Sequence, residues 1–146
     1  DTMPLSPLQA SVLLPQLARL DTLNQQKTSA AQFIQSRVVP RLTGWRWMSP
    51  LDPKIQPCHY KIAWAARSRD QRNRIVQLAA EWELPIGEGF REMSRCSEKR
   101  CRKPVSLQQS AALGETMFVL DHRALLVDSD QLEELGNALV QLHDQT

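Results

Sequence analysis

The stretch that decides the fold is Ser6-Pro7-Leu8-Gln9-Ala10, which continues through Gln16-Leu17-Ala18-Arg19-Leu20-Asp21 to Asn24. Ser6 is a favourable N-cap, and Pro7 stands at the first helical position, where its missing N–H costs nothing. Apolar residues then recur at helical spacing. The sequence therefore predicts one long helix from Pro7 to about Arg37, with a bend that Pro15 causes near residues 11–14.

The first half of this helix carries more apolar side chains than a small domain can cover. These side chains belong to Leu5, Leu8, Val12, Leu13 and Leu14. Exposed apolar patches of this kind drive association. We therefore expect residues 1–37 to connect to another domain or subunit, and we expect a dimer or a higher oligomer through this helix.

A strand follows a proline-rich stretch. Residues 38–57 contain several prolines, which is typical of a loop. Residues 58–66 alternate, so that Tyr60, Ile62 and Trp64 share one face while their neighbours face the other way. This pattern predicts a strand with one well-buried face and assigns Tyr60 to the core.

Short helices and strands alternate through the rest of the chain. Ser68 and Gln71 form a capping box that begins the next helix. Residues 84–86 predict an edge strand, because Pro85 cannot donate to a ladder. Gly114 is typical of the end of a short helix, and one more strand and one more helix follow.

This order of elements predicts the fold class. Short strands between helices favour an α+β two-layer sandwich, in which helices cover a small, mostly antiparallel sheet. Residues 38–146 then form a single compact unit together with the helix of residues 1–37. The length of 146 residues agrees with one domain.

Composition excludes several classes of protein. The net charge is +2, which gives no overall electrostatic case for nucleic acid or membrane, and no apolar run approaches the ~18 residues of a membrane span. The three cysteines cannot all pair within the chain. This count favours reduced thiols and a cytoplasmic location.

The chain resembles the DegT/DnrJ/StrS family of aminotransferases that use pyridoxal phosphate (PLP). The first stretch is similar to the family's helix between its large and small domains. Further segments that carry the resemblance are Cys58-His59-Tyr60-Lys61-Ile62-Ala63-Trp64, Ser68-Arg69-Asp70, Glu83-Leu84-Pro85-Ile86 and Phe118 to Leu126. Together they cover nearly the whole chain.

The resemblance implies that this chain is the C-terminal small domain of such an enzyme. Family members transfer an amino group, commonly from glutamate, to a keto-sugar nucleotide. The active site would then form between a large PLP-binding domain and this one, across a homodimer. None of the five lysines has a Schiff-base context like the family's, so we expect no catalytic residue here, no cofactor bound by this chain alone and no activity without the large domain.

Departures from the family pattern favour a divergent branch. Asp121 follows Leu120 where the family has proline, and Glu83 stands where the family has glycine. The segment Gly87–Arg91 and the run from Arg100 to Arg102 are also unlike the general pattern. These differences imply a related keto substrate as an alternative to the usual one.

The best candidate substrate-binding segment is Gly87-Glu88-Gly89-Phe90-Arg91. The two glycines, Gly87 and Gly89, let the backbone approach a ligand, and Arg91 can hold a carboxylate or phosphate with two hydrogen bonds. The alternative is a turn between two strands with a surface arginine. Arg100 and Arg102 extend the candidate as a phosphate-binding loop, or else belong to a solvated basic loop.

Two further possibilities remain beside this one. His122 follows a strand, and the resemblance places its region near the mouth of the active site, although a structural histidine is the alternative. The basic stretch Arg91–Lys103 also fits a noncatalytic binding or regulatory module for an anionic partner.

Cys96 and Cys101, considered together with His59 or His122, lack the spacing of a zinc site, so we expect no metal.

Overall fold

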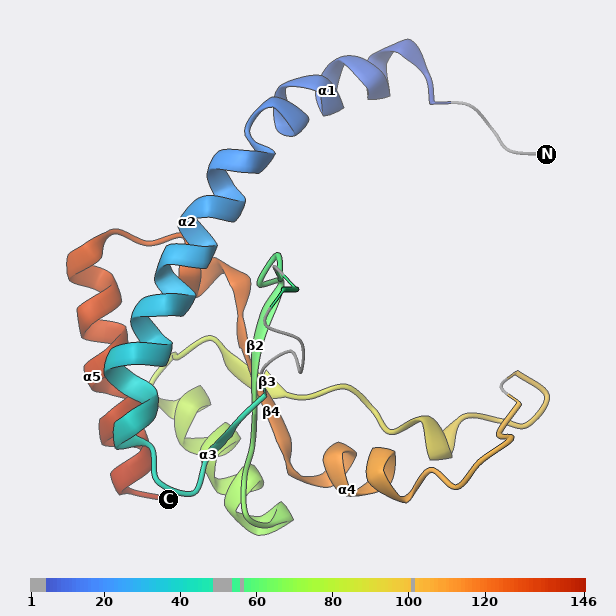
Figure 1. Cartoon of the computed structure of the whole chain (residues 1–146), viewed down its shortest axis with the longest axis vertical. Coiled ribbons are helices and arrows are strands. Elements are labelled where there is room, and N and C mark those ends of the chain that lie inside the picture. The colour runs from blue at the N-terminus through green and yellow to red at the C-terminus, as the bar shows by residue number, and fades with distance from the viewer. Residues whose placement is uncertain (1–4, 49–53, 56, 101) are drawn as a thin grey trace.

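The computed structural model describes residues 5–48, 54–55, 57–100 and 102–146 (Figure 1). Its α-helices are α1 (Pro7–Ala18), α2 (Leu20–Phe33), α3 (Arg69–Glu81), α4 (Gln108–Thr116) and α5 (Ser129–Asp144). Its strands are β1 (Arg46–Trp47), β2 (Lys61–Ala65), β3 (Ile86–Glu88) and β4 (Met117–Asp121). A π-helical turn η1 (Ile34–Val38) and the short 3₁₀ turns η2 (Val39–Arg41), η3 (Met93–Arg95) and η4 (His122–Leu125) complete the set.

The four strands form one antiparallel sheet in the order β1-β2-β4-β3. Lys61 of β2 lies opposite Asp121 of β4, and Gly87 of β3 lies opposite Val119. The predicted edge strand is therefore confirmed, although it begins at Ile86. Strand β1 was not predicted, because its two residues lie in a stretch whose prolines are typical of a loop.

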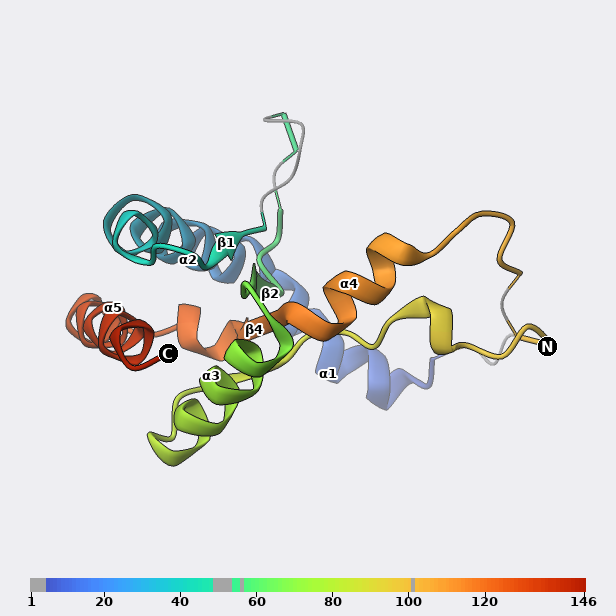
Figure 2. The ribbon, with the colours of Figure 1, turned by 90° about the horizontal axis from the view of Figure 1, so that it is seen from below.

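Helices α2, α3 and α5 pack on one face of the sheet around an aromatic core (Figure 2). Trp64 of β2 is fully buried and stacks on Phe118 of β4, with ring centroids 5.7 Å apart. Trp45 packs edge-on against both rings. The predicted α+β arrangement, a small sheet covered by helices, is confirmed.

Tyr60 does not belong to this core, and its predicted burial is wrong. Strand β2 begins at Lys61, one residue after Tyr60, and His59 has a left-handed backbone with φ of 46°. This turn carries Tyr60 out of the strand's alternation, so that 60% of it is exposed. Its ring stacks instead on His122, at a centroid distance of 5.3 Å.

The long N-terminal helix is divided in two. Ser6 caps α1 as predicted, and Gln9 completes a capping box with it. The break falls at Arg19, whose N–H bonds the carbonyl of Gln16, and not at the predicted position near residues 11–14. Pro15 is tolerated inside α1 because the helix has no buried residue, so water can reach the carbonyl that Pro15 leaves without a donor.

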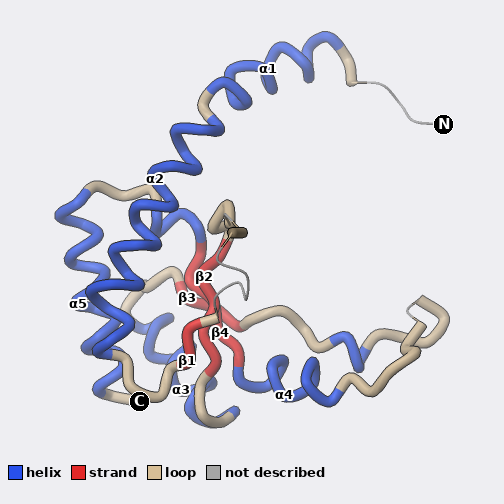
Figure 3. The backbone as a smooth tube through the Cα atoms, in the orientation of Figure 1, coloured by secondary structure: helices blue, strands red, loops and turns tan. Residues whose placement is uncertain are grey.

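Helix α1 projects away from the sheet and the other helices (Figure 3). More than half of the surface of Leu8, Val12 and Leu17 is exposed, which confirms that the first half of the helix exposes apolar residues. In the part of the chain that the structure describes, no helix combines the length and the apolar character that a membrane span requires.

We expect the exposed leucines of α1 to cause self-association of the chain. Replacing Leu8 and Leu17 together by glutamine removes apolar surface that only an external partner can cover, so the double variant should sediment as a smaller species than the wild type. Val105→Gln is the matched control, because Val105 is equally exposed but lies outside α1. A wild-type chain that sediments as a monomer at all concentrations would contradict this expectation.

Candidate functional site

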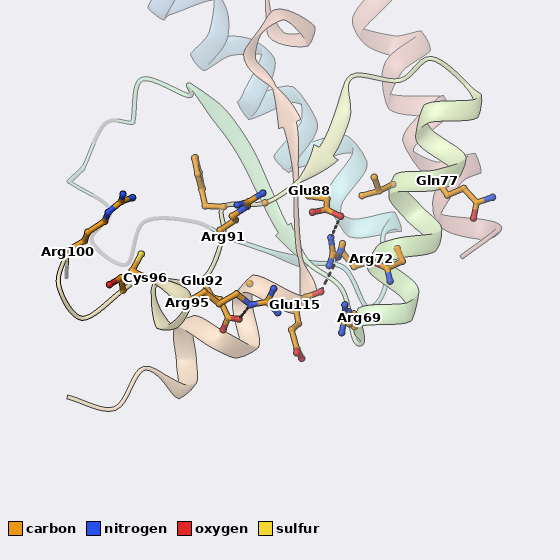
Figure 4. A pocket seen from close by; sticks show the side chains of 16 residues that line it. Arg69, Arg72, Gln77, Glu88, Arg91, Glu92, Arg95, Cys96, Arg100 and Glu115 are labelled. Carbon is orange, nitrogen blue, oxygen red and sulfur yellow. Dashed lines mark hydrogen bonds and ion pairs between the residues drawn. The ribbon is translucent and has the colours of Figure 1, made fainter. Parts of the chain in front are cut away.

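A groove of about 1210 Å³ lies between α3, the segment that follows β3 and the end of α4 (Figure 4). Its chemistry is dominated by arginine. The guanidinium groups along it belong to Arg69, Arg72, Arg91, Arg95 and Arg100. The carboxylates along it belong to Glu88, Glu92 and Glu115.

Arg72 forms the buried base of the groove. Only 6% of Arg72 is exposed, because it lies on the same face of α3 as Ile75 and Ala79. One terminal nitrogen is 2.8 Å from Oε1 of Glu88, and its Nε donates to the backbone carbonyl of Glu115 at 3.1 Å. A buried charge requires such partners. Arg72 therefore joins α3 to β3 and to the end of α4.

The start of α3 fixes where its arginines lie. The Ser68 hydroxyl accepts a hydrogen bond from the N–H of Gln71 at 3.1 Å, as predicted. The Gln71 side chain, however, accepts from the N–H of Arg67, so the reciprocal bond of a capping box is displaced by one residue. With this cap, Arg69 stands in the first turn of α3, one turn before Arg72.

Two glycines let the walls of the groove approach each other. A Cβ added at Gly89 would lie 2.8 Å from side-chain atoms of Met117, and a Cβ added at Gly114 would lie 2.7 Å from Cβ of Glu92. Gly114 does not end its helix as predicted, because α4 continues to Thr116. Gly87 lies within β3 and has open space at its Cβ position, so the alternative of a turn does not hold at Gly87.

Ion pairs satisfy only part of the charge in the groove. Glu92 pairs with Arg95 and accepts a hydrogen bond from the Ser94 hydroxyl. The pKa of the Glu92 carboxyl is lowered mainly by the hydrogen bond from Ser94 and then by the one from Arg95. The Glu88 carboxylate pairs with Arg72. Within the described residues, the side chains of Arg69 and Arg91 have no hydrogen-bond or ion-pair partner.

The groove brings together three of the predicted site residues, Gly89, Arg91 and Arg100. Figure 4 shows Arg100 at the far end, beside Cys96. Gly87 and Arg102 do not line the groove, and neither does His122. A single cluster of all six predicted residues is therefore not formed.

His122 lies at the opposite end of β4 from the groove, at the start of η4. Its Nδ1 is buried and lies 3.4 Å from Oδ1 of Asp121, without the geometry of a hydrogen bond. The Arg123 side chain and N–H both bond the same carboxylate, and these bonds lower the pKa of Asp121. His122 thus belongs to a separate cluster with Tyr60.

Sequence reasoning missed Arg69 and Arg72. The sequence placed both in the helix that begins after Ser68 and gave them no role in a site. A signal was present, because Arg72 precedes Ile75 and Ala79 by three and seven residues and so falls on the buried face. A charged residue at such a position requires a partner, and that requirement points to a structured polar site.

The residues of the groove fit an anion and do not fit PLP. PLP in aminotransferases is held by a lysine, and no lysine is among the described residues that line the groove. Among the described residues, no group of three or more potential metal ligands is present either. Cys96 is exposed, and Cys101 lies outside the described residues.

Comparison with known proteins identifies the fold. No protein-family model and no curated protein matches the sequence. The chain is similar to 3-amino-5-hydroxybenzoic acid (AHBA) synthase, with a TM-score of 0.80 and 22% identity over 99% of this chain and 40% of that one. It is also similar to the PLP form of a Streptococcus pneumoniae protein assigned as a sugar aminotransferase, with a TM-score of 0.77 and 12% identity over 97% of this chain and 36% of that one.

The chain therefore spans two fifths or less of the length of the solved proteins that it matches. The chain shares its fold with part of these two proteins, so the α+β fold predicted from the resemblance is confirmed.

The two glycines of the predicted segment should respond differently to alanine. Gly89→Ala forces a Cβ against Met117, and we expect a loss of about 1–3 kcal/mol in the free energy of unfolding, as for other overpacked sites. Gly87→Ala meets open space within a strand and should be neutral or stabilise by up to about 1 kcal/mol. Urea unfolding of both variants measures this, and equal effects would contradict the assignment of Gly89 as the close-approach position.

Proposed function

We propose that this chain is the C-terminal small domain of a PLP-dependent aminotransferase related to the DegT/DnrJ/StrS family. The observation that carries the proposal is the shared fold, which covers 99% of this chain but only 40% of AHBA synthase. That ratio supports a larger domain outside residues 1–146. The exposed apolar surface of α1 supports it as well, because Leu8, Val12 and Leu17 lack a partner within the described residues.

In this proposal PLP is held by the larger domain. When bound there, PLP supplies the electron sink for amino transfer. The small domain contributes an anion-binding wall, in which the unpaired Arg91 binds the anionic group of the keto substrate and fixes its orientation. Arg91 suits this role because Gly89 keeps its segment close to β4 and because no described residue neutralises its charge.

The substrate class follows from this wall and from the resemblance. A keto-sugar nucleotide carries phosphate groups that an arginine-rich groove can bind, and a related anionic keto substrate would suit the departures from the family pattern. We also propose a homodimer and a cytoplasmic location for the whole protein. Neither nucleic acid nor membrane is a partner in this proposal.

Amino transfer by the product of the intact gene tests the proposal. With glutamate as donor and a set of phosphorylated keto compounds as acceptors, the purified protein should form 2-oxoglutarate in step with the aminated product. Formation of neither compound with any acceptor, in a protein that still binds anions through the groove, would favour the noncatalytic binding module instead.

We predict that Arg91→Lys in the intact enzyme raises KM for the anionic substrate. Lysine keeps the charge but cannot reproduce the two parallel hydrogen bonds of a guanidinium, so the loss should approach that of a charged hydrogen bond, about 1.5–3 kcal/mol. The free energy of unfolding should change by less than about 0.5 kcal/mol, since Arg91 is exposed. Arg74→Lys is the control, because Arg74 is exposed on α3 and does not line the groove.

Steady-state kinetics and a melting curve of both variants measure these effects. Unchanged KM and kcat with a large drop in melting temperature would identify Arg91 as a structural residue and would remove it from the site.

A further inference from the structure

We infer that the groove around Arg72 is a binding site for a phosphate or diphosphate group, which Arg69 holds from the α3 wall and Arg91 from the wall after β3. The inference goes beyond a single arginine on the substrate. Only the assignment of the phosphate to the substrate rests on the proposed function. The binding of phosphate is a property of this chain alone.

Positive charge remains along the groove after the ion pairs are counted. Arg72 and Arg95 are matched by Glu88 and Glu92. The side chains of Arg69, Arg91 and Arg100 are left along the groove without a described partner, against one further carboxylate, Glu115. An excess of positive charge in a hollow with low-dielectric walls attracts small anions.

The two walls of the groove are held in place by Arg72. The guanidinium of Arg72 is bound at two points, to Glu88 of β3 and to the carbonyl of Glu115. Arg69 is one turn away from it on α3, and Arg91 follows Glu88 by three residues. Arg69 and Arg91 line the same groove as this pair, and in the view of Figure 4 they appear on either side of it.

Two unpaired arginines in one groove favour phosphate over carboxylate as the bound anion. A carboxylate has two oxygens, which a single arginine saturates with two parallel hydrogen bonds. A phosphate monoester has three free oxygens and a charge of about −1.5 to −2 at neutral pH, and the diphosphate of a sugar nucleotide also carries several free oxygens and negative charge on both phosphates. Either group can therefore engage two arginines from different directions. The volume of about 1210 Å³ also leaves room for the rest of a phosphorylated molecule.

Titration of the 146-residue chain with inorganic phosphate and with pyrophosphate tests the site, at an ionic strength kept constant with sodium chloride. Both probes should bind, and Arg69→Ala and Arg91→Ala should each weaken binding at least about tenfold, as expected for a charged hydrogen bond. Arg74→Ala is the matched control, with the same charge and helix but outside the groove, and should change binding less than twofold. Glu115→Gln should strengthen binding, because it removes the unmatched carboxylate.

The preference between the two probes distinguishes a phosphate monoester from a diphosphate as the natural group. Acetate at the same concentrations should not compete, and melting curves should show that Arg69→Ala and Arg91→Ala remain folded. Absence of phosphate binding, equal competition by acetate, or an Arg74→Ala effect as large as that of Arg91→Ala would each overturn the site.

Failure of this inference can be told apart from failure of the proposed function. The titration needs neither cofactor nor catalysis, whereas the proposed function is tested by amino transfer in the intact gene product. A chain that fails to bind phosphate while the intact protein transfers amino groups overturns only the site.

Discussion

The buried guanidinium of Arg72 is the constraint on which the candidate site depends. It lies on a helix face that otherwise packs into the core, so its charge must keep both of its partners. Those partners belong to an edge strand and to the end of α4, two elements that are far apart in sequence. The bonds of Arg72 therefore set the spacing of the groove walls. Gly89 and Gly114 then permit the close contacts with Met117 and Glu92 that this spacing requires.

The core differs from helix α1 and the groove in how completely its side chains find partners within the chain. Around Trp64 and Phe118, the helices and the sheet bury their apolar faces against each other. Helix α1 and the groove do the opposite, since one exposes leucines and the other exposes unpaired arginines. Apolar surface of this extent calls for a protein partner, while unpaired guanidinium groups in a hollow call for an anion. A small domain that packs against a larger one through α1 and binds an anion in the groove would account for both features.

Local rules were sufficient for much of the fold. Capping at Ser6 and Ser68, alternation at Ile62 and Trp64, and Pro85 before an edge strand all depend on neighbouring residues, and the structure confirms them. Predictions failed where a distant contact decides the outcome. The role of Gly114 depends on Glu92, and the partners of Arg72 belong to two other elements. The bend predicted from Pro15 failed for the opposite reason, because α1 has no buried residue. The candidate site was consequently predicted only in part, through Arg91, Gly89 and Arg100.

The central proposal is that this chain completes an enzyme whose cofactor is held elsewhere in the same protein. Borohydride reduction of the intact gene product, followed by peptide mapping, tests it most directly. The account predicts one PLP per chain, fixed to a lysine that is not among Lys27, Lys54, Lys61, Lys99 and Lys103. Attachment to one of these five lysines, or a protein that retains no PLP, would contradict it.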